Sequence, residues 1–463
     1  MTLIMRTWLT NRVVLTGNDD LFISEGYGVE TKRGKAVSAT EGDHKIVVDG
    51  SIVSGGIAVS MTEDVGSIEL LINKTGVIRG FDKAIVIDGE GANVANAGSI
   101  YGSIRFRHEA EDAEATEFIN TGTITADGVS ISGKSEIDVI NFGTILGEVK
   151  LSSADDSFAA MEGSLVAFVS GGKGDDDYIT QVEYLAIEER KDGGHDTVQS
   201  FVDFRLPRFV EELQLVGSGD TAGVGNGMVN TIGGNAGDNF LDGRGGDDLI
   251  LGRGGDDYID GGTGDDKLNG GAGDDIAYGG MGEDELYGRQ GRDQLFGGGG
   301  EDVLVGGGGA DLLEGGVGDD ILNGQAGNDV LEGNQGSDVM LGRNGSDILI
   351  GGLGGDTMFG GSGADSFVYM RQADSLRSDM DDIRDFTSGK DVLDFSDFAV
   401  EILAVEIGGG SSADPVLGPS IGTTSKGGNT IVFVDTDGDG QRDDMAIFLD
   451  GTASVSVSDF VLV

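Results

Sequence analysis

The chain of 463 residues has no cysteine, three prolines, one tryptophan and three histidines. Without cysteine there are no disulfides, no thiol nucleophiles and no cysteine-ligated zinc sites. Three prolines give no support to a stiff, proline-rich linker. The histidines, His44, His108 and His195, form no His-Glu-x-x-His motif, which excludes a zinc protease of that type. No Gly-x-Ser-x-Gly nucleophile elbow comes with a supporting histidine, which argues against a serine hydrolase.

Basic residues and long apolar runs are also scarce. The 30 Lys and Arg residues face 82 Asp and Glu residues, and the formal net charge is -52. No basic patch is present to neutralise phosphates, so nucleic acid is not an expected partner. Nothing resembles a membrane span of about 18 apolar residues. Arg6 and Arg12 interrupt the first apolar runs, so the start lacks the continuous core of a secretory signal.

Between Gly234 and Val368 a nine-residue unit repeats fifteen times in phase, in the form Gly-x-x-Gly-x-Asp-x-Leu-x. The sixth position is aspartate except at Asn239, and the eighth is apolar, with Ala277 the one small residue. Two glycines three apart allow the positive backbone angles and close approach that a compact stacked turn needs. A carboxylate beside glycine-rich carbonyls is the ligand chemistry that calcium prefers. A short strand that recurs in every such unit buries its central side chain only by stacking.

These residues resemble the calcium-binding nonapeptide repeats of the repeats-in-toxin (RTX, haemolysin-type) family, with clean copies at Gly261–Asn269 and Gly315–Asn323. The resemblance implies a parallel β-roll with two nonapeptides per coil and calcium ions between stacked turns. Fifteen units would form between seven and eight coils and hold roughly a dozen Ca²⁺ ions. The alternative is a glycine-aspartate solenoid without metal, in which the stacked aspartates would repel one another.

The resemblance implies that the ligands are the sixth-position aspartates together with the turn formed by the first and fourth glycines. The aspartates are Asp248, Asp257, Asp266, Asp275, Asp284, Asp293, Asp302, Asp311, Asp320, Asp329, Asp338, Asp347, Asp356 and Asp365. The first-position glycines are Gly243, Gly252, Gly261, Gly270, Gly279, Gly288, Gly297, Gly306, Gly315, Gly324, Gly333, Gly342 and Gly351. The fourth-position glycines are Gly246, Gly255, Gly264, Gly273, Gly282, Gly300, Gly309, Gly318, Gly327, Gly336, Gly345 and Gly354. Further candidate ligands are Asp176, in an isolated copy at Gly171–Ile179, and Asp385 and Asp391 after the block.

The repeat block is too acidic and too rich in glycine to compact alone. It carries 27 acidic against 6 basic residues and 43 of the 86 glycines. Glycine loses much conformational freedom on folding, so calcium has to supply both neutralisation and folding free energy. We therefore expect a block that is unfolded without metal and folded with it. Weak calcium sites of the extracellular class need millimolar metal, which predicts an exported protein.

The RTX resemblance also implies an export route. Proteins of this family typically leave Gram-negative bacteria by type I secretion, through an uncleaved C-terminal signal, and fold on meeting external calcium. The last residues, Ser458–Val463, are similar to the family's ending of an acidic residue followed by apolar ones. They are equally consistent with the last strand of the domain. We expect a secreted protein, extracellular or on the surface of a Gram-negative bacterium, with the type I secretion apparatus as a partner.

The segment after the repeats resembles the cap that closes the β-roll in serralysin-type secreted metalloproteases, without their catalytic domain. The likeness rests on Asp381–Phe386 and Gly389–Asp394. A second acidic turn, Asp435–Gly440, has the first, third, fifth and sixth residues of an EF-hand loop but Ala446 at the twelfth position. Its flanks alternate as strands, so a solvated hairpin turn is the alternative to a calcium site.

The first half of the chain carries a looser repeat. Asn96–Ile100, Asn120–Ile124 and Asn141–Ile145 share the form Asn-x-Gly-x-Ile. The glycines that recur in this way are Gly50, Gly76, Gly98, Gly122, Gly143 and Gly163. Their spacing predicts a right-handed parallel β-helix with about three short strands per coil and hydrogen-bonded, stacked asparagines. A β-sandwich of short, regularly spaced strands is the alternative.

We therefore expect an all-β chain, a parallel β-solenoid in which a β-helix runs into a calcium β-roll with a small β cap. The expected segments are an irregular β-helix-like region, 1–170, a degenerate repeat and spacer region, 171–233, the β-roll, 234–368, and the C-terminal cap, 369–463.

For function we expect a non-enzymatic cell-surface, adhesion or matrix component, with a cell-surface glycan or self-association as further partners. The alternative is a β-helix polysaccharide lyase, epimerase or hydrolase with an RTX tail. Its best local cluster is basic and mixed in charge, and comprises Tyr101, Arg105, Arg107, His108, Glu109, Glu111 and Asp112. Basic groups there could neutralise a uronate while a base takes the α-proton. A mixed charge run on an inserted loop is more often a solvated face.

Overall fold

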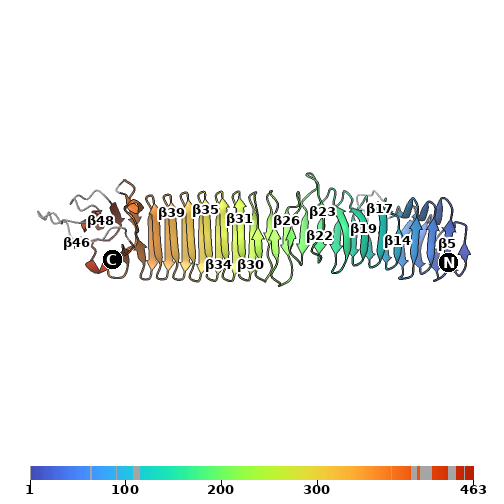
Figure 1. Cartoon of the computed structure of the whole chain (residues 1–463), viewed down its shortest axis with the longest axis horizontal. Coiled ribbons are helices and arrows are strands. Elements are labelled where there is room, and N and C mark those ends of the chain that lie inside the picture. Colours follow the sequence, from blue (N-terminus) through green and yellow to red (C-terminus); the bar gives the residue numbers. More distant parts are fainter. Residues whose placement is uncertain are drawn as a thin grey trace. The chain divides into compact units, whose positions relative to one another are not determined.

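The computed structural model describes residues 2–62, 65–89, 91–107, 115–376, 378–397, 404–406, 420–435, 445–452 and 454–462. The chain divides into two compact units, Met1–Val216 and Gly217–Val463. Within each unit, short parallel strands stack side by side (Figure 1). The predicted all-β parallel solenoid is confirmed and the β-sandwich alternative is wrong, because successive strands pair in parallel at intervals of one coil.

The described helical elements are two 3-10 turns, η1 (Gln372–Ser375) and η2 (Val457–Asp459). Within the described ranges, no helix has the length and apolarity needed to cross a membrane.

One parallel sheet runs through the whole of unit 1. Its strands, in order, are β1 (Thr2–Met5), β4 (Asp20–Ile23), β7 (Gly42–Val48), β10 (Val65–Ile72), β13 (Ala92–Asn96), β16 (Thr116–Asn120), β18 (Ile137–Asn141), β20 (Ser157–Ala160), β22 (Asp177–Thr180), β24 (Thr197–Ser200) and β26 (Glu212–Leu215).

Two further columns of strands complete the first coils. One contains β2 (Trp8–Leu9), β5 (Gly28–Thr31), β8 (Ser51–Ser54), β11 (Val77–Gly80) and β14 (Ser99–Tyr101), and the other contains β3 (Val13–Leu15), β6 (Lys35–Ala39), β9 (Ile57–Met61), β12 (Lys83–Ile87) and β15 (Ile104–Phe106). The last strands of both columns, β14 and β15, pair with the long strand β17. From β17 on, each coil has one strand where the earlier coils have two. These are β17 (Thr123–Ser132), β19 (Thr144–Lys150), β21 (Leu165–Ser170) and β23 (Ile187–Glu188), while β25 (Phe204–Arg205) comes later in the unit. Three strands per coil therefore describe the first coils only.

The shared Asn-x-Gly-x-Ile pattern marks a buried asparagine ladder in unit 1. The Nδ2 group of Asn96 donates to Oδ1 of Asn120, and Nδ2 of Asn120 donates to Oδ1 of Asn141, both at 2.8 Å. Each of these Oδ1 atoms also accepts a backbone N–H from the glycine two positions on, as Asn120 does from Gly122 at 3.2 Å. The predicted stacking of asparagines is confirmed.

Unit 2 is a two-sided roll in which each coil contains two nonapeptides. One sheet contains β28 (Thr231–Gly233), β30 (Leu249–Gly254), β32 (Lys267–Ala272), β34 (Glu285–Gln290), β36 (Val303–Gly308), β38 (Ile321–Ala326), β40 (Val339–Asn344) and β42 (Thr357–Ser362). The other contains β27 (Ala222–Val224), β29 (Phe240–Asp242), β31 (Tyr258–Thr263), β33 (Ile276–Met281), β35 (Gln294–Gly299), β37 (Leu312–Val317), β39 (Val330–Gln335), β41 (Ile348–Leu353) and β43 (Ser366–Val368).

The core of the roll is one column of side chains under each sheet. Leu268 lies opposite Ile250 in one neighbouring coil and Leu286 in the other, and all three are fully buried. Even Ala277 is 1% exposed. Each coil contains two nonapeptides and the eighth residue of each points inward, as predicted. The apolar core is only one side chain wide under each sheet, so it does not stabilise the turns.

A small β structure follows the roll. β44 (Asp381–Ile383) pairs with β42, and β45 (Val392–Asp394) pairs with β43. β49 (Met445–Leu449) and β50 (Phe460–Val461) extend the two sheets, while β47 (Ser420–Lys426), which also pairs with β46 (Ala404–Glu406), β48 (Asn429–Asp435) and β49 form an antiparallel meander. The strand flanks predicted for the acidic turn are therefore observed, and the rest of that turn, residues 436–444, lies outside the described residues.

Candidate functional site: the aspartate ladder of the roll

Each sixth-position aspartate of the roll turns its carboxylate inward, under the turn. All fourteen are between 0% and 2% exposed. Oδ1 of Asp293 accepts the backbone N–H of Asp275, one coil earlier, at 2.9 Å, and the same bond links the neighbouring coils of the roll. Oδ1 thus links the turns of neighbouring coils.

The second carboxylate oxygen has no such role. Among the described residues, Oδ2 is buried without a hydrogen-bond partner in all fourteen aspartates, from Asp248 to Asp365. A Cβ added to Gly297 would lie 2.4 Å from Oδ2 of Asp302 and 2.6 Å from the carbonyl oxygen of Gly315, one coil on. A carboxylate and a carbonyl both accept hydrogen bonds and neither donates, so two such oxygens at one place need a proton or a cation between them. The donor set is all oxygen, which fits calcium.

The glycines of the repeat leave room for this arrangement. A Cβ on fourth-position Gly300, whose φ is +144°, would lie 1.8 Å from the carbonyl oxygen of Gly282. A Cβ on a first-position glycine such as Gly297 would instead meet the aspartate of its own unit. Both positions therefore need glycine, the first for the carboxylate and the fourth for the approach of the next coil.

The second position of the repeat has a left-handed backbone even where its residue is not glycine. Left-handed backbone occurs there in non-glycine residues with φ between 72° and 86°, namely Arg244, Arg253, Arg289, Gln325, Asn334 and Arg343. Non-glycine residues in this region store strain that the surrounding structure must offset. The sequence carries no signal for it beyond glycine at the same position in other copies.

Burial raises the pKa of the ladder carboxyls. Desolvation is the largest cause, like charges on neighbouring coils add to it, and the backbone N–H bond opposes it. The pKa is raised to about 7 for Asp248, Asp257, Asp275, Asp284 and Asp338, and to about 6 for Asp266, Asp311, Asp320, Asp329, Asp356 and Asp365. Without a cation, these carboxyls therefore hold protons at a pH where ordinary aspartates are ionised.

The carboxylates named after the block behave differently from the ladder. Asp385 accepts the backbone N–H groups of Gly360 and Gly361 through its two oxygens, at 2.9 and 2.8 Å. Asp391 accepts those of Asp365 and Thr387, at 3.1 and 2.7 Å. Both side chains thus already use both oxygens to close the last turns.

Asp381, in contrast, has the ladder pattern. Its Oδ1 accepts the N–H of Asp356 at 3.1 Å, and its Oδ2 is buried without a partner among the described residues. The sequence does not predict this role of Asp381, because an irregular segment separates it from Asp356 and the nine-residue repeat has already ended.

Asp176, far before the block, also has the ladder pattern. Its Oδ1 accepts the backbone N–H of Asp156 at 2.9 Å, and its Oδ2 is buried and without a partner among the described residues. Burial is the largest cause that raises the pKa of Asp176, to about 8.

The basic cluster proposed for catalysis is not brought together by the residues that the structure describes. Tyr101 ends β14 and Arg105 lies in β15, which belongs to a different column of strands. His108, Glu109, Glu111 and Asp112 lie outside the described residues, and Arg107 is the last described residue before them.

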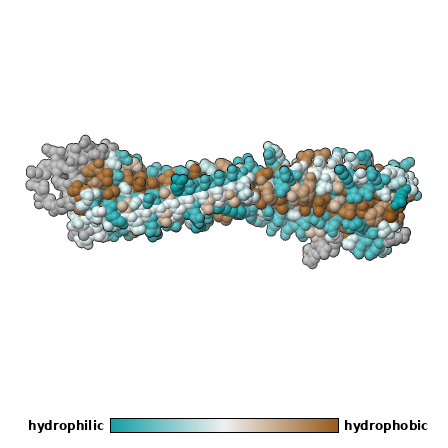
Figure 2. All heavy atoms as spheres, turned by 90° about the horizontal axis from the view of Figure 1, so that it is seen from below, coloured by the Kyte–Doolittle hydropathy of each residue, from teal (hydrophilic) through white to brown (hydrophobic). Residues whose placement is uncertain are grey.

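Tyr101 instead lies in a groove of about 730 Å³ on unit 1. The guanidinium of Arg79 is 4.4 Å from the centre of the Tyr101 ring. Phe81 beside it is 92% exposed, and Glu30, Lys32 and Asp127 also line the groove. On the face shown in Figure 2, unit 1 carries broad apolar areas, while the roll shows mostly white and teal rows.

Comparison with known proteins gives the repeats a name. The family description "RTX calcium-binding nonapeptide repeat" matches residues 224–259, 251–286, 260–295, 278–313, 296–331, 332–367 and 341–376. Residues 224–376 are RTX calcium-binding repeats. The match lies within unit 2 and coincides with the aspartate ladder, so the predicted resemblance is confirmed for this part of the chain.

Among solved structures, this chain is similar to the AlgE6R2 subunit of the mannuronan C5-epimerase from Azotobacter vinelandii, at 26% identity over 32% of this chain and 91% of that one, with a TM-score of 0.25. The AlgE6R3 subunit of that epimerase matches at 21% identity over 45% of this chain and 80% of that one, with a TM-score of 0.16. The extracellular lipase LipA from Serratia marcescens matches at 18% identity over 59% of this chain and 45% of the lipase, with a TM-score of 0.13. No curated protein sequence matches the chain.

Proposed function

We propose that the RTX roll binds calcium through its aspartate ladder and folds only when it meets calcium outside the cell. The observation that carries this is the row of buried Oδ2 atoms without partners, from Asp248 to Asp365. A bare buried carboxylate is unfavourable, because it needs either a proton or a cation. Each ion would lie between two coils, with Oδ2 of one aspartate and the first-position carbonyl of the next coil as ligands, and roughly a dozen ions would fill the ladder.

This chemistry favours secretion as the setting. RTX repeats are typical of secreted proteins. A roll that needs calcium of the extracellular range stays unfolded in the cytosol and folds after export. Passage through a type I secretion apparatus of a Gram-negative bacterium fits that order of events. The terminal residues Phe460 and Val461, named above as part of an export signal, pair with Leu393 and Asp394 as the last strand of the cap.

The recognising surface that we propose is the groove on unit 1. Phe81 and Tyr101 expose aromatic rings there, with Arg79 and Lys32 beside them. Aromatic faces next to a few charged groups suit a ligand with apolar faces and many hydroxyl or carboxylate groups, as a cell-surface polysaccharide has. The protein would then act as a non-enzymatic adhesion or matrix component, with the roll as its calcium-dependent part.

Binding and turnover are separated by one set of measurements. Full-length protein in calcium is titrated with alginate, pectate and bacterial exopolysaccharides, and the chain length and unsaturated ends of each polymer are then analysed. We expect saturable binding without new ends, weakened about tenfold in Phe81→Ala and Tyr101→Ala. Phe142→Ala is the control, because Phe142 is 48% exposed on the same unit and does not line the groove. Shortened, epimerised or unsaturated products would favour the polysaccharide-modifying enzyme instead.

A further inference from the structure

A second kind of carboxylate site lies in unit 1, before the matched repeats of residues 224–376. Asp176, Glu189 and Asp196 each place one oxygen so that the three oxygens lie within 4.8 Å of one another. The three residues are 1%, 7% and 0% exposed. Asp176 and Asp196 precede β22 and β24, and Glu189 follows β23, so the cluster joins three successive segments of the solenoid.

The hydrogen bonds leave part of this cluster without partners. Oδ1 of Asp196 accepts the backbone N–H of Asp176 at 3.0 Å. Oδ2 of Asp176 and Oδ2 of Asp196 are both buried and have no partner among the described residues. Glu189 receives the Tyr178 hydroxyl on Oε1 and the backbone N–H of Arg190 on Oε2, at 3.3 Å for the latter. The N–H of Gly172 also donates to Oε2 of Glu189, at 3.4 Å. Two buried carboxylate oxygens without partners therefore lie beside a third carboxylate whose own oxygens already accept hydrogen bonds.

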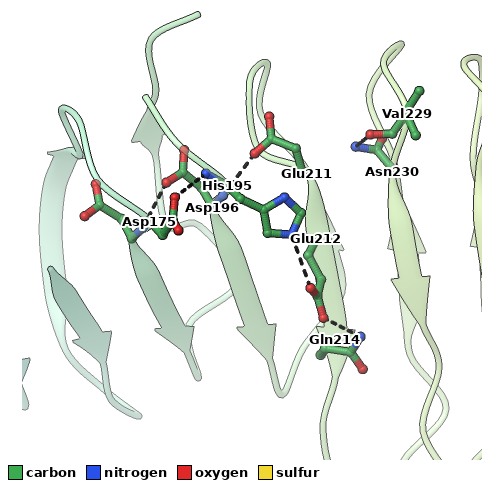
Figure 3. Close-up of polar contacts among 9 residues, drawn as sticks. Asp175, His195, Asp196, Glu211, Glu212, Gln214, Val229 and Asn230 are labelled. Atoms are coloured by element: carbon green, nitrogen blue, oxygen red, sulfur yellow. Dashed lines mark hydrogen bonds and ion pairs between the residues drawn. The ribbon is translucent and has the colours of Figure 1, made fainter. Parts of the chain in front are cut away.

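The surroundings make room for the cluster but supply no cation. A Cβ on Gly193 would lie 3.2 Å from Oδ2 of Asp196 and 3.3 Å from Oε2 of Glu189, so glycine there keeps the space open. Among ion pairs of the described residues, none includes a carboxylate of the cluster. The nearest basic residue in sequence to Asp196, His195, turns to Glu212 instead, with 3.6 Å between Nε2 and Oε2 (Figure 3).

We propose that Asp176, Glu189 and Asp196 bind one calcium ion that holds this end of unit 1 together. All donors are oxygens, which disfavours zinc. Three oxygens within 4.8 Å of one another can share one ion at calcium distances of about 2.3–2.6 Å. Magnesium usually keeps several of its waters, for which a cluster of buried carboxylates is poorly suited.

This site differs from those of the roll in charge. A roll aspartate would share its ion with backbone carbonyls, whereas three carboxylates converge in unit 1. Calcium affinity rises with the number of charged ligands, so the unit 1 site fills at a lower calcium concentration than the roll. The segment between β22 and β24, which carries Glu189, would then be fixed before the roll folds.

The test is a calcium titration of the full chain followed by hydrogen exchange and mass spectrometry, because peptides report each region separately. Peptides within 171–200 should gain protection at a calcium concentration about tenfold lower than peptides within 260–350. Glu189→Gln should raise that concentration about tenfold or more for 171–200 and leave the roll peptides unchanged. Magnesium alone should protect neither region.

Two further variants keep the proposal falsifiable. Tyr178→Phe removes the hydroxyl bound to Glu189 but no carboxylate, so its calcium midpoint should match that of the wild type within about twofold. Asp302→Asn alters the roll only and should leave 171–200 unchanged. A wild-type midpoint for 171–200 in both Glu189→Gln and Asp196→Asn, or protection of 171–200 that does not depend on calcium, would overturn the proposal.

Discussion

The two units stack their turns with two ladders that differ by one chemical group. In unit 1 the amide of Asn120 both donates and accepts, so each asparagine satisfies the next. In the roll the carboxylate of Asp293 only accepts, so one oxygen is satisfied by the backbone and the other is not. The hydrogen bonds of an asparagine ladder are therefore complete within the protein, whereas an aspartate ladder needs a proton or a cation as well. The difference predicts that the stacking of the asparagine ladder does not depend on calcium, whereas the stacking of the aspartate ladder does.

The first coil of the roll supports this comparison from within unit 2. Asn239 occupies the aspartate position, and its Nδ2 donates to Oδ1 of Asn235 at 3.2 Å. Its Oδ1 accepts the backbone N–H of Asn235 at 2.7 Å. Where asparagine replaces aspartate, both polar atoms of its side chain therefore have hydrogen-bond partners within the same turn.

The largest expected effect comes from closing the space between coils of the roll. Gly300→Ala places a Cβ 1.8 Å from the carbonyl oxygen of Gly282 at a φ of +144°. Strain and overpacking together should cost ~3 kcal/mol or more. The roll of this variant should stay unfolded, by circular dichroism, at calcium concentrations that fold the wild type. Gly299→Ala is the control, because a Cβ there meets nothing within 4 Å, and an equal loss in both variants would contradict the account.

The next effect breaks the ladder of unit 1. Asn120→Ala removes the acceptor of Nδ2 of Asn96 and one of the two donors to Oδ1 of Asn141, which keeps the N–H of Gly143. This change should destabilise unit 1 by about 2–4 kcal/mol. Urea denaturation should show the loss equally with calcium and with chelator. Asn73→Ala, which removes an exposed bond to Asp49, should change stability by less than about 0.5 kcal/mol. A loss in Asn120→Ala that appears only in calcium would show that the two ladders are not independent.

Acid should act mainly on the roll. Burial raises the pKa of its carboxyls to about 6 or 7, above the ordinary 3.8 of the unfolded chain. This protonation stabilises the metal-free roll below about pH 4, and the contribution is lost as pH rises through about 7. Calcium has to displace these protons, so its midpoint should rise by about tenfold or more between about pH 7.5 and pH 5.5. A midpoint that falls on acidification would contradict this assignment.

The smallest effect converts one coil of the roll to the chemistry of unit 1. Asp302→Asn keeps the side-chain shape but removes one of many calcium ligands, so the calcium midpoint should rise only about threefold. In chelator the variant should be slightly less expanded than the wild type, because the unfolded chain loses one of its many mutually repelling negative charges. Analytical ultracentrifugation measures the expansion and isothermal titration measures the binding. A variant that binds calcium as tightly as the wild type would show that Asp302 is not a ligand.

The sequence predicts the roll almost residue by residue because its period never shifts. Leu268 and Asp266 have the same surroundings as Leu286 and Asp284 one coil on, so one interpretation of the unit applies to all copies. The asparagine ladder of unit 1 could also be predicted, since its asparagines and glycines recur at nearly constant spacing.

The other features of the fold and of the sites depend on contacts between residues that do not belong to a sequence repeat. Glu189 joins Asp176 and Asp196 from a segment that carries no nonapeptide, and Asp381 joins the ladder only after the repeat has been interrupted. The change from three strands per coil to two occurs at β17, where Ile124 and Ile131 bring two columns onto one strand. The roles of these residues follow only from the contacts between stacked coils.

The most direct test of the central claim is the calcium dependence of amide exchange, compared between the two ladders in the full chain. Peptides around Asn96, Asn120 and Asn141 should be protected in chelator as in calcium, while peptides around Asp275, Asp293 and Asp311 should exchange freely in chelator and become protected in millimolar calcium. Equal protection of the roll peptides with and without calcium would contradict the claim that calcium completes the aspartate ladder.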